Sequence, residues 1–223
     1  DAEAVFEINC PGEYGFLVTV GTGVICISKD DDGKFVRVGG LGHDEGDMGS
    51  GYWLGKELLL QLALNETSVL GDAQLEELMS FILKHFKSEN FQSALEYLNE
   101  SKNRIAKIAS IAKGLIYYAE QNNEIALEIV QKATHHVAEY IVSLADLIEY
   151  KDSNIVLAGN GSVIKNSFFR KMINDELKFN FKNVKWTFLS ISPAYGAGIL
   201  SAKMKNINVK ISDILKGSPI VSS

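Results

Sequence analysis

The sequence predicts an α/β fold, and three observations on its 223 residues support that prediction. The first part of the chain is rich in glycine and β-branched residues, which is typical of short strands joined by turns. From Tyr52 to Ile148 the apolar residues instead recur at helical spacing, and from Asn154 onward strand and helix patterns alternate again. Strands that alternate with helices form a sheet covered by helices, and 46% hydrophobic residues suffice to bury its core.

A short helix and three strands are expected before the helical part begins. Residues 2–8 have the spacing of a helix, and two apolar runs predict strands at 15–20 and 24–28. A third strand, at 34–38, follows an Asp-Asp-Gly turn. Because only Gly21-Thr22-Gly23 separates the first two strands, we expect the three strands to form an antiparallel meander.

Helices dominate the middle of the chain. One helix should begin after Ser50, whose hydroxyl can cap the first turn. Two long apolar stripes, separated by Gln121-Asn122-Asn123, predict a helical hairpin. The two stripes run over 105–119 and 129–148, and the other predicted helices are 72–86, 91–98, 163–177 and 195–204. The remaining strands are 154–158 and 184–189, and the tail from 206 onward looks peripheral.

Charge and cysteine content exclude several classes of protein. A net charge of −6 argues against a general nucleic-acid binder, which needs a basic face to neutralise phosphates. No apolar run reaches the roughly 18 residues that span a bilayer. The only two cysteines, Cys10 and Cys26, are not spaced as metal ligands and read as buried thiols. We therefore expect a cytoplasmic protein with neither a nucleic-acid nor a membrane partner.

Three glycine-rich turns carry the features that suggest chemistry. Gly21-Thr22-Gly23 can form a backbone nest for an anion, although a bare hairpin turn would look the same. Gly159-Asn160-Gly161 lies between a strand and a helix, which is a common way to bring a nucleotide against backbone. The small residues of Pro193–Gly198 allow close approach of a helix to a sheet, to a base or to another helix.

The loop from Val38 to Gly55 holds seven glycines, three acids and a histidine. Its crowded side chains, His43, Asp44, Glu45 and Asp47, suggest a metal site. Adjacent residues rarely converge on one ion, however, and no recognised zinc or calcium spacing is present. We therefore expect no dedicated metal site, and we expect the glycines to bring the backbone close to a ligand.

Taken in order, GTG, GGLGHDEGDMGSGYWLG, a helical pair, LAGNGS and PAYGAGIL resemble one known pattern. They are similar to the BadF/BadG-type ATPase and N-acetylglucosamine kinase family of the actin-like, hexokinase and Hsp70 superfamily. Within it, the chain most resembles archaeal broad-specificity hexokinases and glucosamine or N-acetylglucosamine kinases. The resemblance implies a ribonuclease H-like mixed sheet with a helical insertion at about 52–122. It also implies ATP-dependent phosphorylation of a hexose or amino-sugar hydroxyl, with ATP, Mg²⁺ and the sugar bound in an interdomain cleft.

The resemblance also implies roles for individual residues. Asp1 matches the general base that accepts the proton of the sugar hydroxyl. The matches for the ligands are Gly21, Thr22 and Gly23 for phosphate, Gly40, Gly42 and Asp47 for the sugar, and Gly159, Asn160 and Gly161 for adenosine. Two positions depart from the family pattern, because Met48 replaces an acidic or polar residue and Leu41 replaces a tryptophan. Both departures lie in the sugar-facing loop and put the identity of the sugar in doubt.

The family's N-terminal DGGGT-type hairpin has no match in these 223 residues. We therefore expect the chain to be the C-terminal domain of a longer protein, whose N-terminal domain is its partner. On this interpretation these 223 residues alone would be inactive, and a homodimer is a further assembly that the family allows.

Two other functions remain open at this point. The first is the activator ATPase of CoA-linked dehydratases or reductases, in which cysteines near the cleft bridge an iron–sulfur cluster. The spacing of Cys10 and Cys26 does not match that cluster. The second is a sugar-sensing relative that no longer transfers phosphate, which Met48 and Leu41 suggest.

Overall fold

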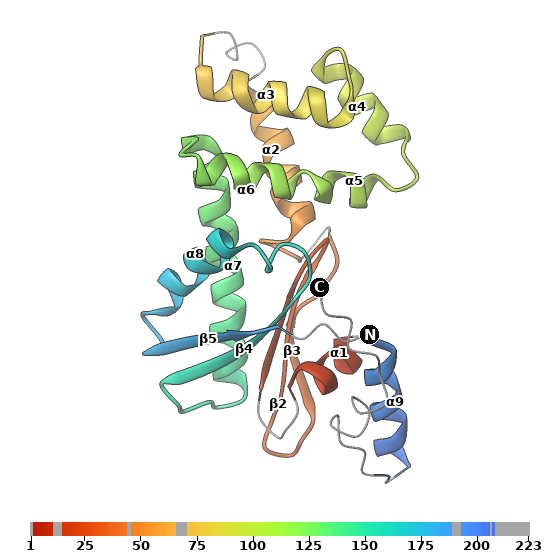
Figure 1. Cartoon of the computed structure of the whole chain (residues 1–223), viewed down its shortest axis with the longest axis vertical. Helices are drawn as coiled ribbons and strands as arrows, with labels where there is room; N and C mark the ends of the chain where they lie inside the picture. Colours follow the sequence, from red (N-terminus) through yellow and green to blue (C-terminus); the bar gives the residue numbers. More distant parts are fainter. Residues whose placement is uncertain are drawn as a thin grey trace, which may run out of the picture.

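The computed structural model describes residues 2–10, 15–43, 46–65, 71–188, 193–205 and 207. These residues contain a five-stranded sheet with the order β3-β2-β1-β4-β5 (Figure 1). Strand β2 is antiparallel to β1 and β3, whereas β4 is parallel to β1 and β5. The bounds are Phe16–Val20 for β1, Val24–Lys29 for β2, Phe35–Gly39 for β3, Asn154–Asn160 for β4 and Asn183–Thr187 for β5. The predicted meander and mixed sheet are confirmed.

Helices surround the sheet and extend beyond one end of it (Figure 1). Ser50 caps α2, since its side chain accepts a hydrogen bond from the N–H of Trp53, as the sequence predicts. The helices of the described residues are α1 Ala2–Asn9, α2 Gly51–Leu64, α3 Ala73–Phe86, α4 Phe91–Glu100, α5 Arg104–Ser110, α6 Ala112–Glu120, α7 Glu124–Leu147, α8 Ser167–Leu177 and α9 Pro193–Met204. None of them is both long enough and apolar enough to cross a membrane.

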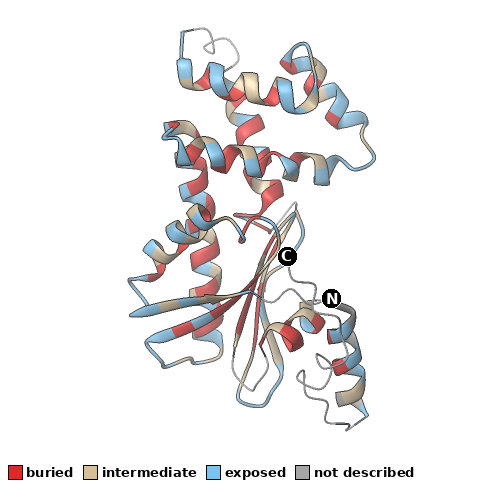
Figure 2. Ribbon diagram, viewed as in Figure 1, coloured by how far each residue is buried: buried red, intermediate tan, exposed pale blue. Residues whose placement is uncertain are grey.

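The two faces of the sheet are covered by different helices. Phe16, Val18 and Val20 of β1 point into a large core that α7 and α8 share with α2 and the helices beyond it. Leu17 points to the opposite face and packs with Phe6 of α1 in a smaller core. Figure 2 shows buried residues running continuously from the sheet into α2 and α7. The alternation along β1 therefore makes a sheet with two buried faces.

Helix α1 is tied to the sheet and to α9 by specific contacts. Lys29 of β2 donates a 2.6 Å hydrogen bond to the buried carboxylate of Glu7. Gly196 of α9 also lies against α1, since a Cβ at Gly196 would be only 1.9 Å from the Ala4 carbonyl oxygen. Gly196 of the PAYGAG segment thus serves helix–helix packing, which was one of the predicted alternatives.

Two glycines let α5 lie directly on α2. A Cβ at Gly55 would be 2.1 Å from the carbonyl oxygen of Ile108, and one at Gly51 would be 3.3 Å from that of Ala109. Both glycines lie on one side of α2 because they are four residues apart. The backbone of α5 is therefore held against the first two turns of α2.

Two helices differ from the prediction. The helix expected at 105–119 is divided at Ile111, whose N–H bonds to the carbonyl of Ile108 and so tightens the turn. The helix expected from Val163 begins at Ser167, because the N–H groups of Val163 and Ile164 donate to the Val20 carbonyl instead. The tail from 206 onward lies outside the described residues, apart from Ile207.

Candidate functional site

Two of the predicted glycine turns meet at one edge of the sheet. Strands β1 and β4 are parallel neighbours, with Thr19 paired to Asn160, so both strands end side by side. The GTG turn follows β1, and the turn at Gly161 follows β4. Ligands of α/β proteins commonly bind outside the carboxyl ends of such strands.

The GTG turn is anchored through its carbonyl groups. The N–H groups of Gly51 and Tyr52, at the start of α2, donate to the carbonyls of Gly21 and Thr22 at 2.7 and 3.1 Å. Within the turn, the N–H of Gly21 donates to the carbonyl of Gly23. Within the described part of the chain, the N–H groups of Thr22 and Gly23 have no acceptor. The turn is thus fixed in place and retains two backbone donors that an anion can use.

The turn after β4 wraps around the end of β1. Gly161 has a φ of +97°, and a Cβ there would be 2.4 Å from the Val20 carbonyl oxygen. Only glycine can satisfy both the positive φ and this close approach. Gly21 and Gly161 are consequently neighbours, since a Cβ on Gly21 would be 3.8 Å from the Cα of Gly161. Asn160 donates its side-chain N–H to the Thr19 hydroxyl at 3.3 Å.

Gly159 has a different neighbour from the one predicted by the resemblance. A Cβ at this position would be 2.3 Å from the ring of Phe188, so the glycine leaves room for that ring. The guanidinium of Arg170 lies over the same Phe188 ring, 4.7 Å from its centre. The lack of a side chain at Gly159 is therefore required by packing, whatever its role toward a nucleotide.

Asp47 is the third component of the site. Asp47 is only 9% exposed. Its backbone φ is +53°, a conformation that aspartate adopts less readily than glycine. A Cβ on Gly23 would be 2.8 Å from Oδ2 of Asp47, so the carboxylate lies against the GTG turn. The other oxygen, Oδ1, is buried and has no hydrogen-bond partner among the described residues.

Tyr140 of α7 lies beside Asp47, and sequence reasoning did not identify it. Its burial raises the pKa of the phenol, a hydrogen bond to the Met48 backbone lowers it, and the nearby Asp47 charge raises it. No local motif marks this tyrosine, since it lies within the regular apolar stripe of a helix. Its position beside the acidic loop arises only when α7 packs across the sheet.

Most glycines of the Val38–Gly55 loop face protein. At six of them, an added Cβ would meet protein atoms at 3.1 Å or less. These six are Gly39, Gly40, Gly46, Gly49, Gly51 and Gly55. At Gly42 a Cβ would meet nothing within 4 Å, and its φ is +96°. Packing thus accounts for the lack of a side chain at six of the seven glycines. Contact of the loop backbone with a ligand, at Gly40 and Gly42 in particular, stays a prediction.

Two cavities border the GTG and Gly161 turns, and α5 takes part in both. The first, of about 440 Å³, lies beside the turn after β4 and is lined by Ala109, Ser110, Ala112, Lys113, Ile116, Ser162, Val163, Lys165 and Asn166. The second, of about 500 Å³, adjoins the GTG turn and is lined by Thr22, His43, Tyr52, Lys102, Asn103, Arg104, Ile105 and Ala106. Residues of α5 and α6 lie far from both turns in the sequence, so the sequence alone gave no signal for them.

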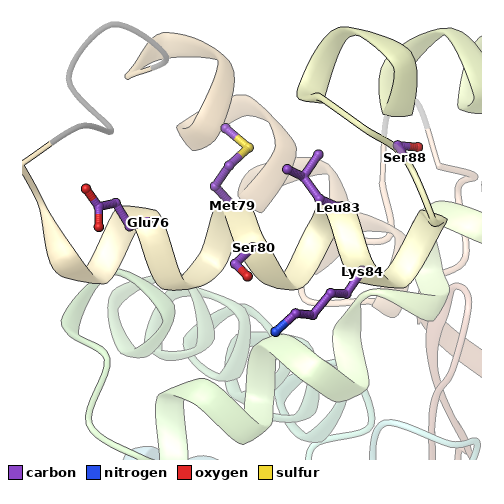
Figure 3. A pocket seen from close by; sticks show the side chains of 6 residues that line it. All are labelled: Glu76, Met79, Ser80, Leu83, Lys84 and Ser88. Carbon is purple, nitrogen blue, oxygen red and sulfur yellow. The ribbon is translucent and has the colours of Figure 1, made fainter.

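Another cavity, of about 450 Å³, lies along α3 in the helical part of the molecule. Figure 3 shows Met79 and Leu83 projecting from the same side of α3. Glu76 lies near one end of the helix, and Lys84 and Ser88 lie near the other. None of its lining residues belongs to the predicted site. This cavity is therefore separate from the turns described above.

Among the described residues, no group of three histidine, cysteine or acidic side chains is placed to hold a metal ion. This holds for the described titratable groups of the loop as well. The ring of His43 packs edge-on against Tyr52, with centres 5.4 Å apart. Asp44 and Glu45 lie outside the described residues. His135 lies on α7, where it pairs with Glu176 at 3.1 Å.

The two cysteines are buried in separate cores on opposite faces of the sheet. Cys26 of β2 belongs to the large core and Cys10, after α1, to the small one. Burial raises the pKa of each thiol to about 12. The pair cannot ligate one cluster, because the sheet lies between them.

Asp1, the predicted general base, lies outside the described residues. The residue that follows it, Ala2, begins α1, and α1 is fixed by the Glu7–Lys29 ion pair and by Gly196. The assignment of Asp1 as the base stays a prediction.

A family model described as the BadF/BadG/BcrA/BcrD ATPase family matches residues 5–201. The chain is 26% identical over 206 residues to the N-acetylmuramic acid/N-acetylglucosamine kinase of Clostridium acetobutylicum. It is 21% identical over 193 residues to the N-acetyl-D-glucosamine kinase of Dictyostelium discoideum. These matches include 90% and 86% of this chain but only 65% and 60% of the relatives, so the chain spans less than two thirds of their length.

Solved structures with a similar fold include two that are described as candidate N-acetylglucosamine kinases. The one from Chromobacterium violaceum has a TM-score of 0.68 at 19% identity, over 89% of this chain and 63% of its own. The one from Porphyromonas gingivalis has a TM-score of 0.59 at 18% identity, over 92% and 65%. At these identities the likeness shows the fold alone, and it confirms the predicted ribonuclease H-like, actin-like class.

Proposed function

Because the chain belongs to the BadF/BadG/BcrA/BcrD ATPase family, we propose that it forms part of a kinase that transfers phosphate from ATP to an amino-sugar hydroxyl. The names of both curated relatives include N-acetylglucosamine, which makes this sugar the first substrate to test. Glucose and glucosamine belong to the same proposal as further acceptors. The kinship to archaeal hexokinases stays a prediction.

The observation that supports this proposal best is the unsatisfied oxygen of Asp47. A buried carboxylate oxygen without a partner costs stability, so its presence calls for an explanation, and a bound ligand is one. A sugar hydroxyl is a suitable donor, since carboxylates accept strong, directional hydrogen bonds. Because the same carboxylate touches Gly23, a hydroxyl bound there would be close to the proposed phosphate turn.

The remaining residues fit a phosphoryl transfer in which the protein positions the reactants. The adenosine would occupy the cavity beside Ser162 and Asn166, and the phosphates would extend along the GTG turn. The free N–H groups of Thr22 and Gly23 would donate to phosphate oxygens. Asp1 would accept the proton of the sugar hydroxyl as transfer proceeds. Mg²⁺ would neutralise phosphate charge and would be held mainly by phosphate oxygens and water.

The proposal includes a partner domain. We infer that the natural protein has an N-terminal domain that completes the site and leaves an interdomain cleft for the nucleotide and the sugar. The lengths of the curated relatives support this inference. A homodimer is an assembly that we leave as a prediction.

A phosphorylation screen of the intact protein tests the proposal. N-acetylglucosamine, glucosamine, glucose and mannose are offered separately with ATP, and the sugar phosphate formed is measured. We expect turnover with at least one amino sugar, and we expect Asp1→Ala to lose transfer but to retain nucleotide binding. ATP hydrolysis that no sugar stimulates would contradict the proposal, and a near-normal kcat of Asp1→Ala would contradict the role of Asp1.

The sensor alternative rests on Leu41 and Met48, which are 76% and 40% exposed beside Asp47. Sugar binding in calorimetry without any phosphate transfer by the intact protein would favour it. The activator-ATPase alternative has less support, because Cys10 and Cys26 lie on opposite faces of the sheet.

A further inference from the structure

The cavity that adjoins Thr22 has a cationic wall. Lys102 and Arg104 line it together with Thr22, His43 and Tyr52. No acidic residue occurs among its lining residues in the described part of the chain. This local excess of positive charge contrasts with the net charge of −6 for the whole chain.

The position of the wall is fixed by the packing of α5. The close contact between Gly55 and Ile108 holds α5 against α2, whose first residues bond to the GTG turn. At the start of α5, Lys107 donates a 2.6 Å hydrogen bond to the Ser101 hydroxyl and lies 3.7 Å from the Tyr97 ring centre. The segment from Ser101 to Arg104 is thereby held near the GTG turn.

The two cations are available to a ligand. Both side chains are exposed, and neither makes an ion pair with any described residue. Lysine serves phosphate as a point charge, and arginine presents several N–H donors that match its oxygens. In the same cavity, Thr22 has a free backbone N–H and a hydroxyl. The lining of one cavity thus offers both cationic side chains and a backbone donor to an oxyanion.

We propose that Lys102 and Arg104 bind the terminal phosphate of the nucleotide, beside the GTG turn. The identity of the anion as a nucleotide rests on the proposed function. Phosphate is favoured over an acidic group on the sugar because Thr22, and not Asp47, is among the residues that line this cavity. The helical segment would then contribute directly to binding of the phosphate donor, in addition to its packing on α2.

The test measures dissociation constants for ATP, ADP and AMP with the intact protein. We compare the natural protein with the double variant Lys102→Ala/Arg104→Ala, and with Lys171→Ala/Lys185→Ala as the matched control. The control also removes two exposed cations, from α8 and β5, that line neither cavity. We expect ATP affinity to fall about tenfold in the first variant, with AMP affinity changed less than about twofold. The control should bind all three nucleotides as the natural protein does.

Two results would overturn the proposal. They are an unchanged ATP affinity and an equal loss of affinity for ATP and AMP. A second variant, Lys102→Gln/Arg104→Gln, removes both charges but keeps a polar side chain at each position, and it should show the same selective loss. Nucleotide binding needs no sugar, so the two proposals can fail separately. A selective loss of ATP affinity in a protein that phosphorylates no sugar would contradict the proposed function but would still support phosphate binding by Lys102 and Arg104.

Discussion

The carboxylate of Asp47 lies directly against the backbone of Gly23, where a Cβ would be 2.8 Å from Oδ2. This contact brings the acidic loop and the GTG turn together, although each belongs to a different segment of the chain. It leaves Oδ1 of Asp47 buried without a partner among the described residues. A hydroxyl bound to this oxygen would therefore lie close to the turn that we propose binds phosphate.

Replacement of Gly23 by alanine should impair transfer more than folding. The added methyl group must displace the Asp47 carboxylate, and small displacements of reactants can cost about a hundredfold in rate. We expect a loss of that order in kcat/KM for the amino sugar, with a loss of only about 1 kcal/mol in the free energy of unfolding. Steady-state kinetics and urea denaturation of the same preparation measure both quantities.

Gly198→Ala serves as the control for that variant. A Cβ on Gly198 would meet nothing within 4 Å, and this residue lies in α9 away from the GTG turn. Its kinetic constants should match those of the natural protein. If Gly23→Ala is equally active, the contact with Asp47 has no part in the reaction.

Gly55→Ala should reduce stability. Its methyl group would meet the carbonyl oxygen of Ile108 at 2.1 Å, so α5 would have to move away from α2. Overpacking of this kind typically costs about 1–3 kcal/mol, which outweighs the helix propensity of about 1 kcal/mol that alanine gains over glycine. Urea denaturation should show a net loss for Gly55→Ala and none for Gly198→Ala. Equal stabilities would mean that α5 does not lie as closely on α2 as the structure indicates.

The pH dependence of stability should include a contribution from His135. Its pKa is raised above 6.5, mainly by the hydrogen bond to Glu176 and also by the charge of Glu139, while partial burial opposes the shift. A group whose pKa is higher in the folded than in the unfolded state stabilises the fold when it is protonated. This stabilisation is complete at pH values below the unfolded-state pKa and is lost as the pH rises through the folded-state pKa. His135→Gln should therefore cost more stability at about pH 5.5 than at about pH 8.5.

The magnitude should remain below about 1 kcal/mol, because the pair is exposed and screened by solvent. Denaturation of His135→Gln at both pH values, alone and combined with Glu176→Gln, isolates the interaction. In the Glu176→Gln background, the pH dependence due to His135 should be reduced. A stability difference that stays constant with pH would rule out this ionic contribution.

Local patterns predicted the strands and most helices well. The GTG turn predicted the β1–β2 hairpin because a short loop between two apolar runs leaves few other arrangements. Ser50 predicted the start of α2 because a capping hydroxyl acts on the next few residues only. Both signals depend on neighbouring residues, so they can be read without knowledge of the tertiary structure.

Features that depend on distant contacts could not be predicted in the same way. Gly51 and Gly55 look like part of a ligand loop, yet they accommodate α5, which lies about fifty residues further along the chain. The late start of α8 arises because Val163 and Ile164 donate to β1. Lys102 and Arg104 carry no motif, and only the packing of α5 on α2 brings them near Thr22.

The most direct test of the proposed site is the affinity of Asp47→Asn for N-acetylglucosamine, measured by calorimetry with the intact protein. Asparagine accepts a positive φ and has almost the same shape, so the variant should fold with an unchanged or higher Tm. Sugar affinity should fall by about tenfold or more, because one charged acceptor is lost. Undiminished sugar affinity in a folded Asp47→Asn protein would show that Asp47 does not bind the sugar.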